Sequence, residues 1–284
     1  MTTELPTQQA LAGCPTFPAD ADALPAEILS GSRLEAAGDE WSLGSMQLPS
    51  EAIPDEISLG LFGVLADMTT GNALARSLPP LTSLRTVNLR MDVVGELATP
   101  GEMVQARGEQ LCLNEHSGVS QTTVRRPDGA ALLVCTARFI VVPHQPLEPL
   151  LSGQQEAMQL RQSAVVSELL GVTAVAHRGE EVQTLITPSD RMANHHGVVH
   201  GGLHVGMADF ALRRAAQGKA GALPVRLVDL ALTYHRPIVI SQERQLVIRS
   251  RVERRGQRVI IVSADIESTS GRLLTSSQGT ALLQ

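Results

Sequence analysis

Aromatic residues are almost absent from this chain of 284 residues, at 2% of the sequence. They are Phe17, Trp41, Phe62, Phe139, Phe210 and Tyr234. A core with so few rings must be built mainly from Leu, Val, Ile, Met and Ala. Because hydrophobic residues still make up 43% of the chain and charged residues only 18%, the composition is that of a folded protein and excludes a disordered one.

Cysteine and long apolar runs are also scarce. The three cysteines, Cys14, Cys112 and Cys135, form no CxxC pair, and the last two lie in apolar, strand-like runs. This pattern indicates reduced, buried thiols and argues against a disulfide framework or a zinc site. The first residues lack the basic and apolar segments of a signal peptide, and no uncharged run approaches the ~20 apolar residues of a membrane helix. We therefore expect a soluble, cytoplasmic protein.

Positive charge is in the minority, because the net charge is −6. Nucleic acids and acidic membranes do not attract an acidic surface, so the charge argues against both as general partners. The basic stretch over Arg251–Arg258 is a local exception, and we expect it to form a solvated strand, turn and strand.

The chain divides into segments of different character. Residues 1–35 are rich in Pro, Ala and Asp and are expected to form an extended or partly helical leader. The apolar residues of Ser58–Leu78 predict one buried helix, which Pro79 and Pro80 end. Strand-like runs follow at 84–94, 102–113, 118–126 and 131–142, and a polar, Pro-bearing linker covers 143–160.

The second half of the chain repeats this order. A helix is predicted over 200–218, followed by strands at 226–240, 245–253, 258–268 and 272–283. Asp67 and Gly129 are 62 residues apart, and Asp209 and Gly271 are also 62 residues apart. Self-similarity at a fixed offset indicates a duplication, so the sequence predicts two domains, at 36–142 and 161–284.

Each predicted domain is of the α+β class, a long helix followed by a meander of about four strands, with one strand before the helix. Two such sheets joined edge to edge would put the two helices side by side. Sheet faces or edges would still need to be covered, so we expect homo-oligomers of these chains.

One stretch of the second half concentrates chemically active residues. Residues 194–209 read NHHGVVHGGLHVGMAD. Gly201 and Gly202 at a helix start would let a ligand approach the backbone, where free N–H groups favour negative charge. An oxyanion formed there would be stabilised by roughly 3–4 kcal/mol per donor. His200 and Asn194 would hold a carbonyl or a water, and a carboxylate nearby would activate water or attack the carbonyl.

The pattern Asn194-x-x-Gly197-x-x-His200-Gly201-Gly202, followed by Asp209, resembles the hotdog-fold thioesterases of the phenylacetate-pathway type. Segments 86–89, 227–230 and 234–237 also resemble the second strand of that family. The resemblance covers 190–284 and, more weakly, 56–142. It implies two tandem hotdog domains, each a long helix wrapped by a curved antiparallel sheet, and an acyl-CoA thioesterase without metal or cofactor.

The resemblance further implies an active site shared between two hotdog units. One unit provides the Asn, the His and the Gly amide, and its partner provides a helix acid and a strand hydroxyl. Asn194, His200 and Gly201 supply the first set, and Asp67 and Thr86 supply the second. Ser83 and Thr82 are alternatives to Thr86, because strand register cannot be fixed to within a residue or two.

The reciprocal site is expected to be inactive. Asp209 is present, but Leu227 stands at the position of Thr86. Ala52, Ser58 and Leu59 replace Asn194, His200 and Gly201. The sequence therefore predicts one competent site in each chain, with Asp67 as its base or nucleophile and Asp209 idle.

Plainer interpretations stand beside these. The group His195, His196, His200 and His204 suggests a metal cluster, but no Glu follows His200 as in the zinc helix motif. Gly201 and Gly202 would also permit close helix packing, and Asp67 would suit an exposed helix face. The alternative function is a non-catalytic acyl-CoA-binding or sensing protein, and a hotdog hydratase is a third. The acyl group, and its carrier, coenzyme A or an acyl carrier protein, remain open.

Overall fold

The computed structural model describes residues 23–50, 57–144, 152–161, 166–221 and 223–283. Within this part of the chain no helix is long and apolar enough to cross a membrane. Cys14, Ala52 and most of the predicted leader lie outside the described residues.

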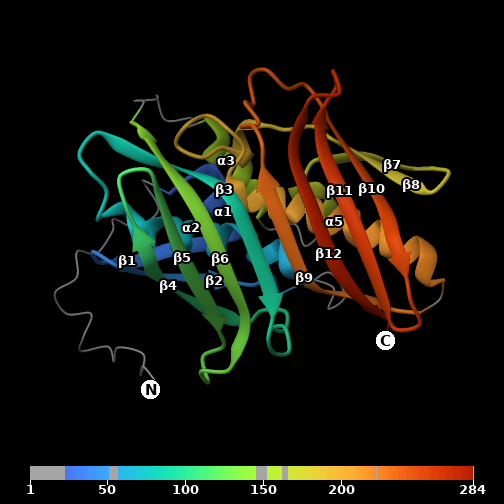
Figure 1. Cartoon of the computed structure of the whole chain (residues 1–284), viewed down its shortest axis with the longest axis horizontal. Helices are drawn as coiled ribbons and strands as arrows, with labels where there is room; N and C mark the ends of the chain where they lie inside the picture. Colours follow the sequence, from blue (N-terminus) through green and yellow to red (C-terminus); the bar gives the residue numbers. More distant parts are fainter. Residues whose placement is uncertain (1–22, 51–56, 145–151, 162–165, 222, 284) are drawn as a thin grey trace.

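The described strands form one antiparallel sheet in the order β1-β2-β4-β5-β6-β3-β9-β12-β11-β10-β8-β7 (Figure 1). In that order they are β1 (Ser32–Ala37), β2 (Trp41–Gln47), β4 (Met103–Leu113), β5 (Ser117–Arg125), β6 (Ala131–Pro143), β3 (Thr82–Val93), β9 (Val225–Tyr234), β12 (Leu273–Leu283), β11 (Val259–Ser268), β10 (Leu246–Arg255), β8 (Glu181–Ile186) and β7 (Val172–Arg178).

The strand order is the same in the two halves when each half is followed from the middle of the sheet to its edge. Strands β3 and β9 join the halves by antiparallel pairing, with Asn88 opposite Thr233 and Asp92 opposite Asp229. The expected meander strands are therefore present in both halves, and the two sheets meet edge to edge as one continuous sheet.

Two strands, and not one, precede the long helix in each half. Strands β1 and β7 lie at the two edges of the sheet and carry several exposed or polar residues. Edge strands of this kind show little alternation of apolar and polar residues, so the sequence pattern does not reveal them. Consequently residues 32–35, which were expected in the leader, are part of β1, and the predicted linker contains α3 (Ser152–Leu160).

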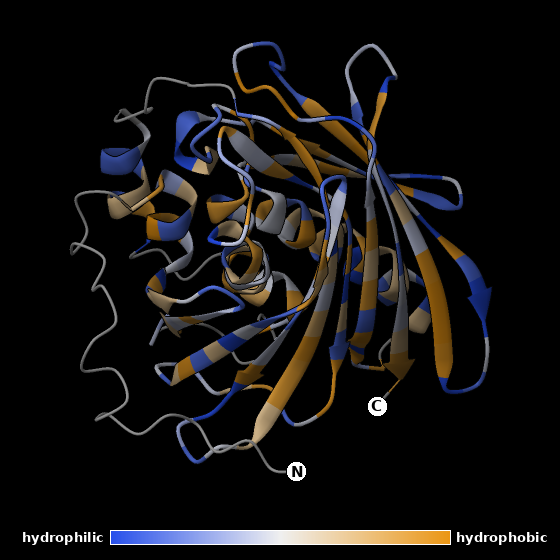
Figure 2. Ribbon diagram, turned by 60° about the vertical axis from the view of Figure 1, so that its left-hand side comes forward, coloured by the Kyte–Doolittle hydropathy of each residue, from blue (hydrophilic) through white to orange (hydrophobic). Residues whose placement is uncertain are grey.

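Two long helices lie side by side beneath the sheet, as Figure 2 shows. Helix α2 (Gly63–Ala75), preceded by η3 (Leu59–Phe62), is almost completely buried, and α5 (Gly201–Ala220) is its counterpart in the second half. The remaining short helices are α1 (Pro25–Ser30), α4 (Val166–Leu169) and η4 (Asp190–Met192). The predicted helix at 200–218 is confirmed, with Gly218 inside its last turn.

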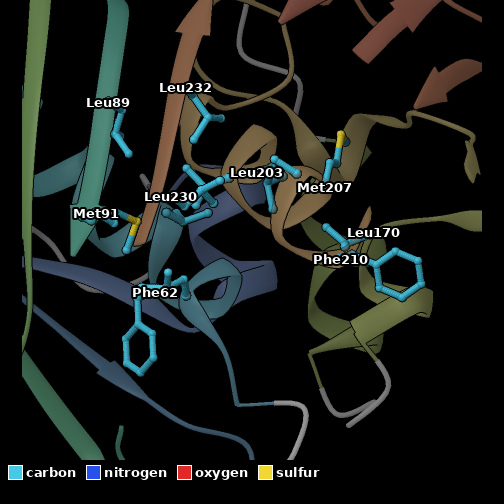
Figure 3. Close-up of a cluster of buried hydrophobic side chains, with 14 of the residues drawn as sticks. Phe62, Leu89, Met91, Leu170, Leu203, Met207, Phe210, Leu230 and Leu232 are labelled. Carbon is cyan, nitrogen blue, oxygen red and sulfur yellow. The ribbon is translucent and has the colours of Figure 1, made fainter. Parts of the chain in front are cut away.

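The hydrophobic core runs without interruption across the junction of the two halves. Phe62 from η3, Leu203 and Met207 from α5, and Leu230 from β9 belong to one buried cluster (Figure 3). Most of the core is aliphatic, as the scarcity of aromatic residues predicts. A continuous core at the join means that the relative position of α2 and α5 is set by packing.

One cysteine departs from expectation. Cys135 is buried, but Cys112 is exposed. The pairing of β4 with β5 is bulged between Gln110 and Cys112, and Leu111 and Cys112 are both exposed. A bulge inserts an extra residue, so the alternation of inward and outward side chains breaks there.

Candidate active site

Asp67 is a buried carboxylate at the interface of the two helices. Its side chain is 9% exposed and projects from α2 towards the first residues of α5. The Thr86 hydroxyl of β3 donates a hydrogen bond to Asp67 Oδ1 at 3.0 Å. His200 Nδ1 lies 3.4 Å from Asp67 Oδ2. Asp67 is therefore not an exposed polar residue of its helix, and it contacts residues of both halves of the chain.

The loop before α5 brings His200 to this position. The Asn194 side-chain oxygen accepts hydrogen bonds from the N–H groups of His196, at 2.8 Å, and Val198, at 3.4 Å. Gly197 has a φ of +67°, a left-handed conformation that glycine adopts without steric cost. The N–H of His200 then donates to the Met192 carbonyl, which fixes the backbone just before the helix.

Asn194 thus has a different contact from the one expected. Its side-chain oxygen holds the turn, whereas the sequence predicted that the side chain would hold the substrate or a water. The residue still lines the same cavity as Asp67 and His200.

The two glycines at the start of α5 are needed for different reasons. A Cβ on Gly201 would lie 2.6 Å from Asp67 Oδ2, so Gly201 permits the close approach of that carboxylate. A Cβ on Gly202 would lie 2.4 Å from the Gly63 carbonyl oxygen, so Gly202 permits the close approach of α2 and α5. Helix packing therefore explains Gly202, and it does not explain Gly201.

Most of the N–H groups at the start of α5 have a hydrogen-bond acceptor. The Gly202 N–H donates to His200 Nδ1 at 3.1 Å and also to the Asp67 carboxylate. The Leu203 N–H donates to the His200 carbonyl. Among the described residues none accepts a hydrogen bond from the Gly201 N–H, and Gly201 lines the cavity. This leaves one backbone donor for a ligand at the positive end of the helix.

Burial determines the electrostatics of Asp67. It raises the pKa of this carboxyl above its ordinary value of 3.8, because the charged form loses its hydration. The charge of His200, and then the hydrogen bonds from Thr86 and Gly202, oppose the rise. A carboxylate in such a setting is a stronger base than one in water.

A cavity of about 1060 Å³ opens over these residues. It is lined by residues of α1, α2, β3, the loop before α5 and the end of β9. Its walls include Asp67, Arg85, Thr86, Phe139, His200 and Gly201. The volume exceeds what a few buried waters occupy and is in the range of binding sites for organic ligands.

Two acidic residues of the wall, Glu27 and Glu35, come from the segment that was expected to be a leader. Glu27 of α1 accepts a hydrogen bond from the Leu24 N–H at 3.1 Å and lines the cavity. Burial raises the pKa of Glu27, and the charge of His200 opposes that rise. Nothing in the sequence linked Glu27 to the motif around His200, because the two are far apart in the chain.

The neighbouring histidines are uncharged at neutral pH. Burial, followed by the charge of His200, lowers the pKa of His195 to about 4. Burial, followed by the charge of His195, lowers the pKa of His196 to about 3. The two rings contact each other with centroids 3.9 Å apart. In the described part of the chain, no cluster of three or more His, Cys, Asp or Glu residues is arranged to hold a metal ion.

The alternatives to Thr86 are engaged elsewhere. The Thr82 hydroxyl donates to the Pro79 carbonyl at 2.6 Å. The Ser83 hydroxyl lies 3.3 Å from His196 Nε2. Of these three hydroxyls, Thr86 is the one that contacts Asp67.

The corresponding carboxylate of the second half has other neighbours. Asp209 is 1% exposed and does not line the cavity. Ser58, which stands at the position of His200, donates its hydroxyl hydrogen to Asp209 Oδ2. Arg213 Nε donates to the same oxygen at 3.0 Å. The carboxylate is thus enclosed by a hydroxyl and a cation.

Strand register supports the alignment of the two halves. Strand β3 carries a β-bulge directly after Thr86, and β9 carries one directly after Leu227. The bulges put Leu227 at the position of Thr86, and Leu227 is buried. Asp209 therefore lacks the strand hydroxyl that Asp67 has.

Comparison with known proteins finds one family match. Residues 196–275 match the model of the thioesterase superfamily. The matched segment contains His200 and Gly201 and begins after Asp67 and Thr86. Comparison with curated protein sequences finds no significant match. The family match supports a thioester hydrolase.

Solved structures show the same fold over most of the chain. A TesB protein of Mycobacterium avium subspecies paratuberculosis has a TM-score of 0.68 at 16% identity, covering 92% of this chain and 100% of that one. The acyl-CoA thioesterase II TesB2 of Mycobacterium marinum has a TM-score of 0.62 at 14% identity, with coverages of 92% and 98%. The 12:0-ACP thioesterase of Umbellularia californica has a TM-score of 0.57 at 12% identity, with coverages of 86% and 94%.

Proposed function

We propose that the chain is a tandem pair of hotdog domains, β1–β6 and β7–β12, that hydrolyses an acyl thioester at one composite site. The observation that carries the proposal is the position of Asp67. This carboxylate of the first half contacts Thr86 of its own half and His200 of the other, beside the Gly201 N–H, which has no acceptor among the described residues. A buried base next to an unpaired helix donor is the arrangement that acyl transfer to water requires.

In this mechanism the thioester carbonyl oxygen accepts a hydrogen bond from the Gly201 N–H. Asp67 then takes a proton from a water that attacks the carbonyl carbon, or attacks that carbon itself. In the first route the C–S bond breaks and the proton held by Asp67 passes to the leaving thiolate. In the second route the C–S bond breaks to give a mixed anhydride on Asp67, which water then hydrolyses, with its protons going to the thiolate and the solvent. The products of both routes are a carboxylic acid and a free thiol. Thr86 binds one oxygen of Asp67 and thereby orients the other.

His200 supplies a further donor. Its Nδ1 accepts a hydrogen bond from the Gly202 N–H, so the proton of the neutral ring resides on Nε2. His200 lines the cavity, and an Nε2–H group there would hold the attacking water or the thioester. This is the role expected from the sequence.

The substrate we propose is an acyl-CoA. Two of the similar structures carry names that specify an acyl-CoA thioesterase and a 12:0-ACP thioesterase, so the acyl carrier protein thioester is the competing substrate. Arg85 lines the cavity and supplies positive charge. Such charge would attract the phosphate groups that both carriers have.

The test is hydrolysis of a panel of acyl-CoAs by the purified protein, followed through release of free thiol. Asp67→Asn should lower kcat by at least about 100-fold, and Asp209→Asn should retain most of the activity. The opposite ranking would overturn the assignment of the site. Tight acyl-CoA binding in calorimetry without any turnover would instead favour a binding protein.

A further inference from the structure

The backbone just after His200 is held by a side chain that the mechanism above does not use. The Tyr234 hydroxyl, at the end of β9, donates to the Gly201 carbonyl at 2.9 Å. The ring of His204, one turn into α5, lies beside the Tyr234 ring.

His204 contacts the sheet. Its Nδ1 lies 2.8 Å from the Thr275 hydroxyl of β12. Burial, followed by the charge of His200, lowers the pKa of His204 to about 3, so the ring is neutral. The rings of His204 and Tyr234 also contact each other, with centroids 5.2 Å apart.

The first half of the chain has apolar residues at all three corresponding positions. Phe62 corresponds to His204 when Asp67 is aligned with Asp209. Tyr234 pairs with Thr275 across β9 and β12, and the corresponding pair across β3 and β6 is Val93 and Leu133.

Phe62 and Leu133 are fully buried, so the fold accepts apolar side chains there. Burying polar groups costs free energy unless each is hydrogen-bonded. The fold therefore does not require polar residues at the positions of His204, Tyr234 and Thr275. These polar residues occur in the half whose helix starts with His200 and Gly201.

We propose that Tyr234 and His204 are positioning residues that hold the backbone beside His200. Tyr234 binds the carbonyl of the Gly201–Gly202 peptide, whose N–H donates to His200 Nδ1. His204, bound to Thr275, packs against the Tyr234 ring. Together they fix the backbone at the start of α5 and keep His200 in its Nε2–H tautomer. The catalytic consequence rests on the proposed function.

The kinetic test uses Tyr234→Phe, His204→Phe and Thr275→Val. The first removes only a hydroxyl, and the second introduces the residue type found at Phe62. Because small displacements of catalytic groups are costly, kcat should fall by about 10- to 100-fold while KM changes by less than about threefold. Ser277→Ala is the matched control. Ser277 lies on β12, as Thr275 does, and its buried hydroxyl donates to the Ala264 carbonyl at 2.9 Å. It should keep kcat within about twofold of the wild type.

A second measurement does not depend on turnover. In protein labelled with ¹⁵N-histidine, the His200 signal, assigned by its loss in His200→Gln, should show protonated Nε2 and unprotonated Nδ1. Tyr234→Phe should shift this signal towards a mixture of tautomers. If the wild type released no thiol but the shift occurred, the proposed function would fail and the positioning role would stand.

Several results would overturn the proposal. These are wild-type kcat in both Tyr234→Phe and His204→Phe, an equal loss in Ser277→Ala, and a fall in kcat with an unchanged His200 signal. If Tyr234→Phe does not fold, the kcat of Thr275→Val tests the proposal instead. This variant leaves both rings in place and removes only the partner of His204 Nδ1.

Discussion

The guanidinium Nε of Arg213 lies 3.0 Å from Oδ2 of Asp209, one turn earlier on α5. The corresponding position in the first half is Gly71, four residues after Asp67, and it lines the cavity. The same helix position therefore holds a cation beside one carboxylate and no side chain beside the other. This difference, together with Ser58 and Leu227, separates an acid that is enclosed by protein groups from one that lines the cavity.

Replacing Arg213 tests that distinction. Arg213→Met leaves Asp209 buried without its cation, and removing one partner of a buried pair costs about 3–5 kcal/mol. Because 20% of the Arg213 side chain is exposed, we expect a loss near the lower end, about 3 kcal/mol, in urea unfolding. The double variant Asp209→Asn/Arg213→Met should recover part of it. Thioesterase activity at a temperature where the variant is folded should be unchanged, and a loss as large as that of Asp67→Asn would contradict the assignment.

Gly201→Ala should separate catalysis from stability. The added Cβ would lie 2.6 Å from Asp67 Oδ2, and the carboxylate would have to move. A shift of this kind should lower kcat by roughly 100-fold. Gly60→Ala is the matched control, because its Cβ would lie 2.9 Å from Oδ2 of Asp209. It should lower the melting temperature and leave kcat within a few-fold. Equal kinetic effects of the two variants would argue against a single active site.

Most of the fold was predictable from the sequence because its inner strands are half-buried. Strands β4 to β6 and β10 to β12 largely alternate buried and more exposed residues, and their observed ends lie within a few residues of the predicted ones. The edge strands β1 and β7 carry no such pattern and were missed. Their positions depend on pairing with β2 and β8, which local sequence does not encode.

The contacts of the candidate site could be predicted from the sequence where its two halves could be aligned. Aligning the halves connected Asp67 with His200 and Gly201, which are more than 130 residues away, and the structure brings them into contact. The contacts of Arg213 and Tyr234 were not predictable in this way. They depend on the direction of a side chain and on a cross-strand register, and one residue of slip in a strand reverses the facing of every side chain.

Thr86→Val should impair the reaction without unfolding the protein. The substitution keeps the shape and removes the hydroxyl that donates to Asp67 Oδ1 at 3.0 Å. We expect kcat to fall by about 10-fold, the size of one hydrogen bond to a charged group, and the thiol-release assay measures it. Thr82→Val serves as the control, since the Thr82 hydroxyl binds the Pro79 carbonyl and not Asp67. A larger loss of kcat in Thr82→Val would show that Thr86 does not supply the strand hydroxyl of the site.

The ionisation of Asp67 should reduce the stability of the folded protein at neutral pH. Burial raises the pKa of this carboxyl, so the folded chain keeps its proton to a higher pH than the unfolded chain does. Stability then falls as pH rises from the ordinary value of 3.8 through the raised value. Asp67→Asn removes this pH-dependent loss of stability.

Scanning calorimetry should therefore show a higher melting temperature for Asp67→Asn than for the wild type at pH 7. The difference should shrink as the pH is lowered below 3.8, where the wild-type carboxyl becomes protonated in both states. Asp209→Asn should behave in the opposite way at pH 7, because it breaks the pair with Arg213. A melting temperature of Asp67→Asn below that of the wild type at pH 7, with a gap that does not change with pH, would show that Asp67 is a stabilising group and would remove the electrostatic argument for its reactivity.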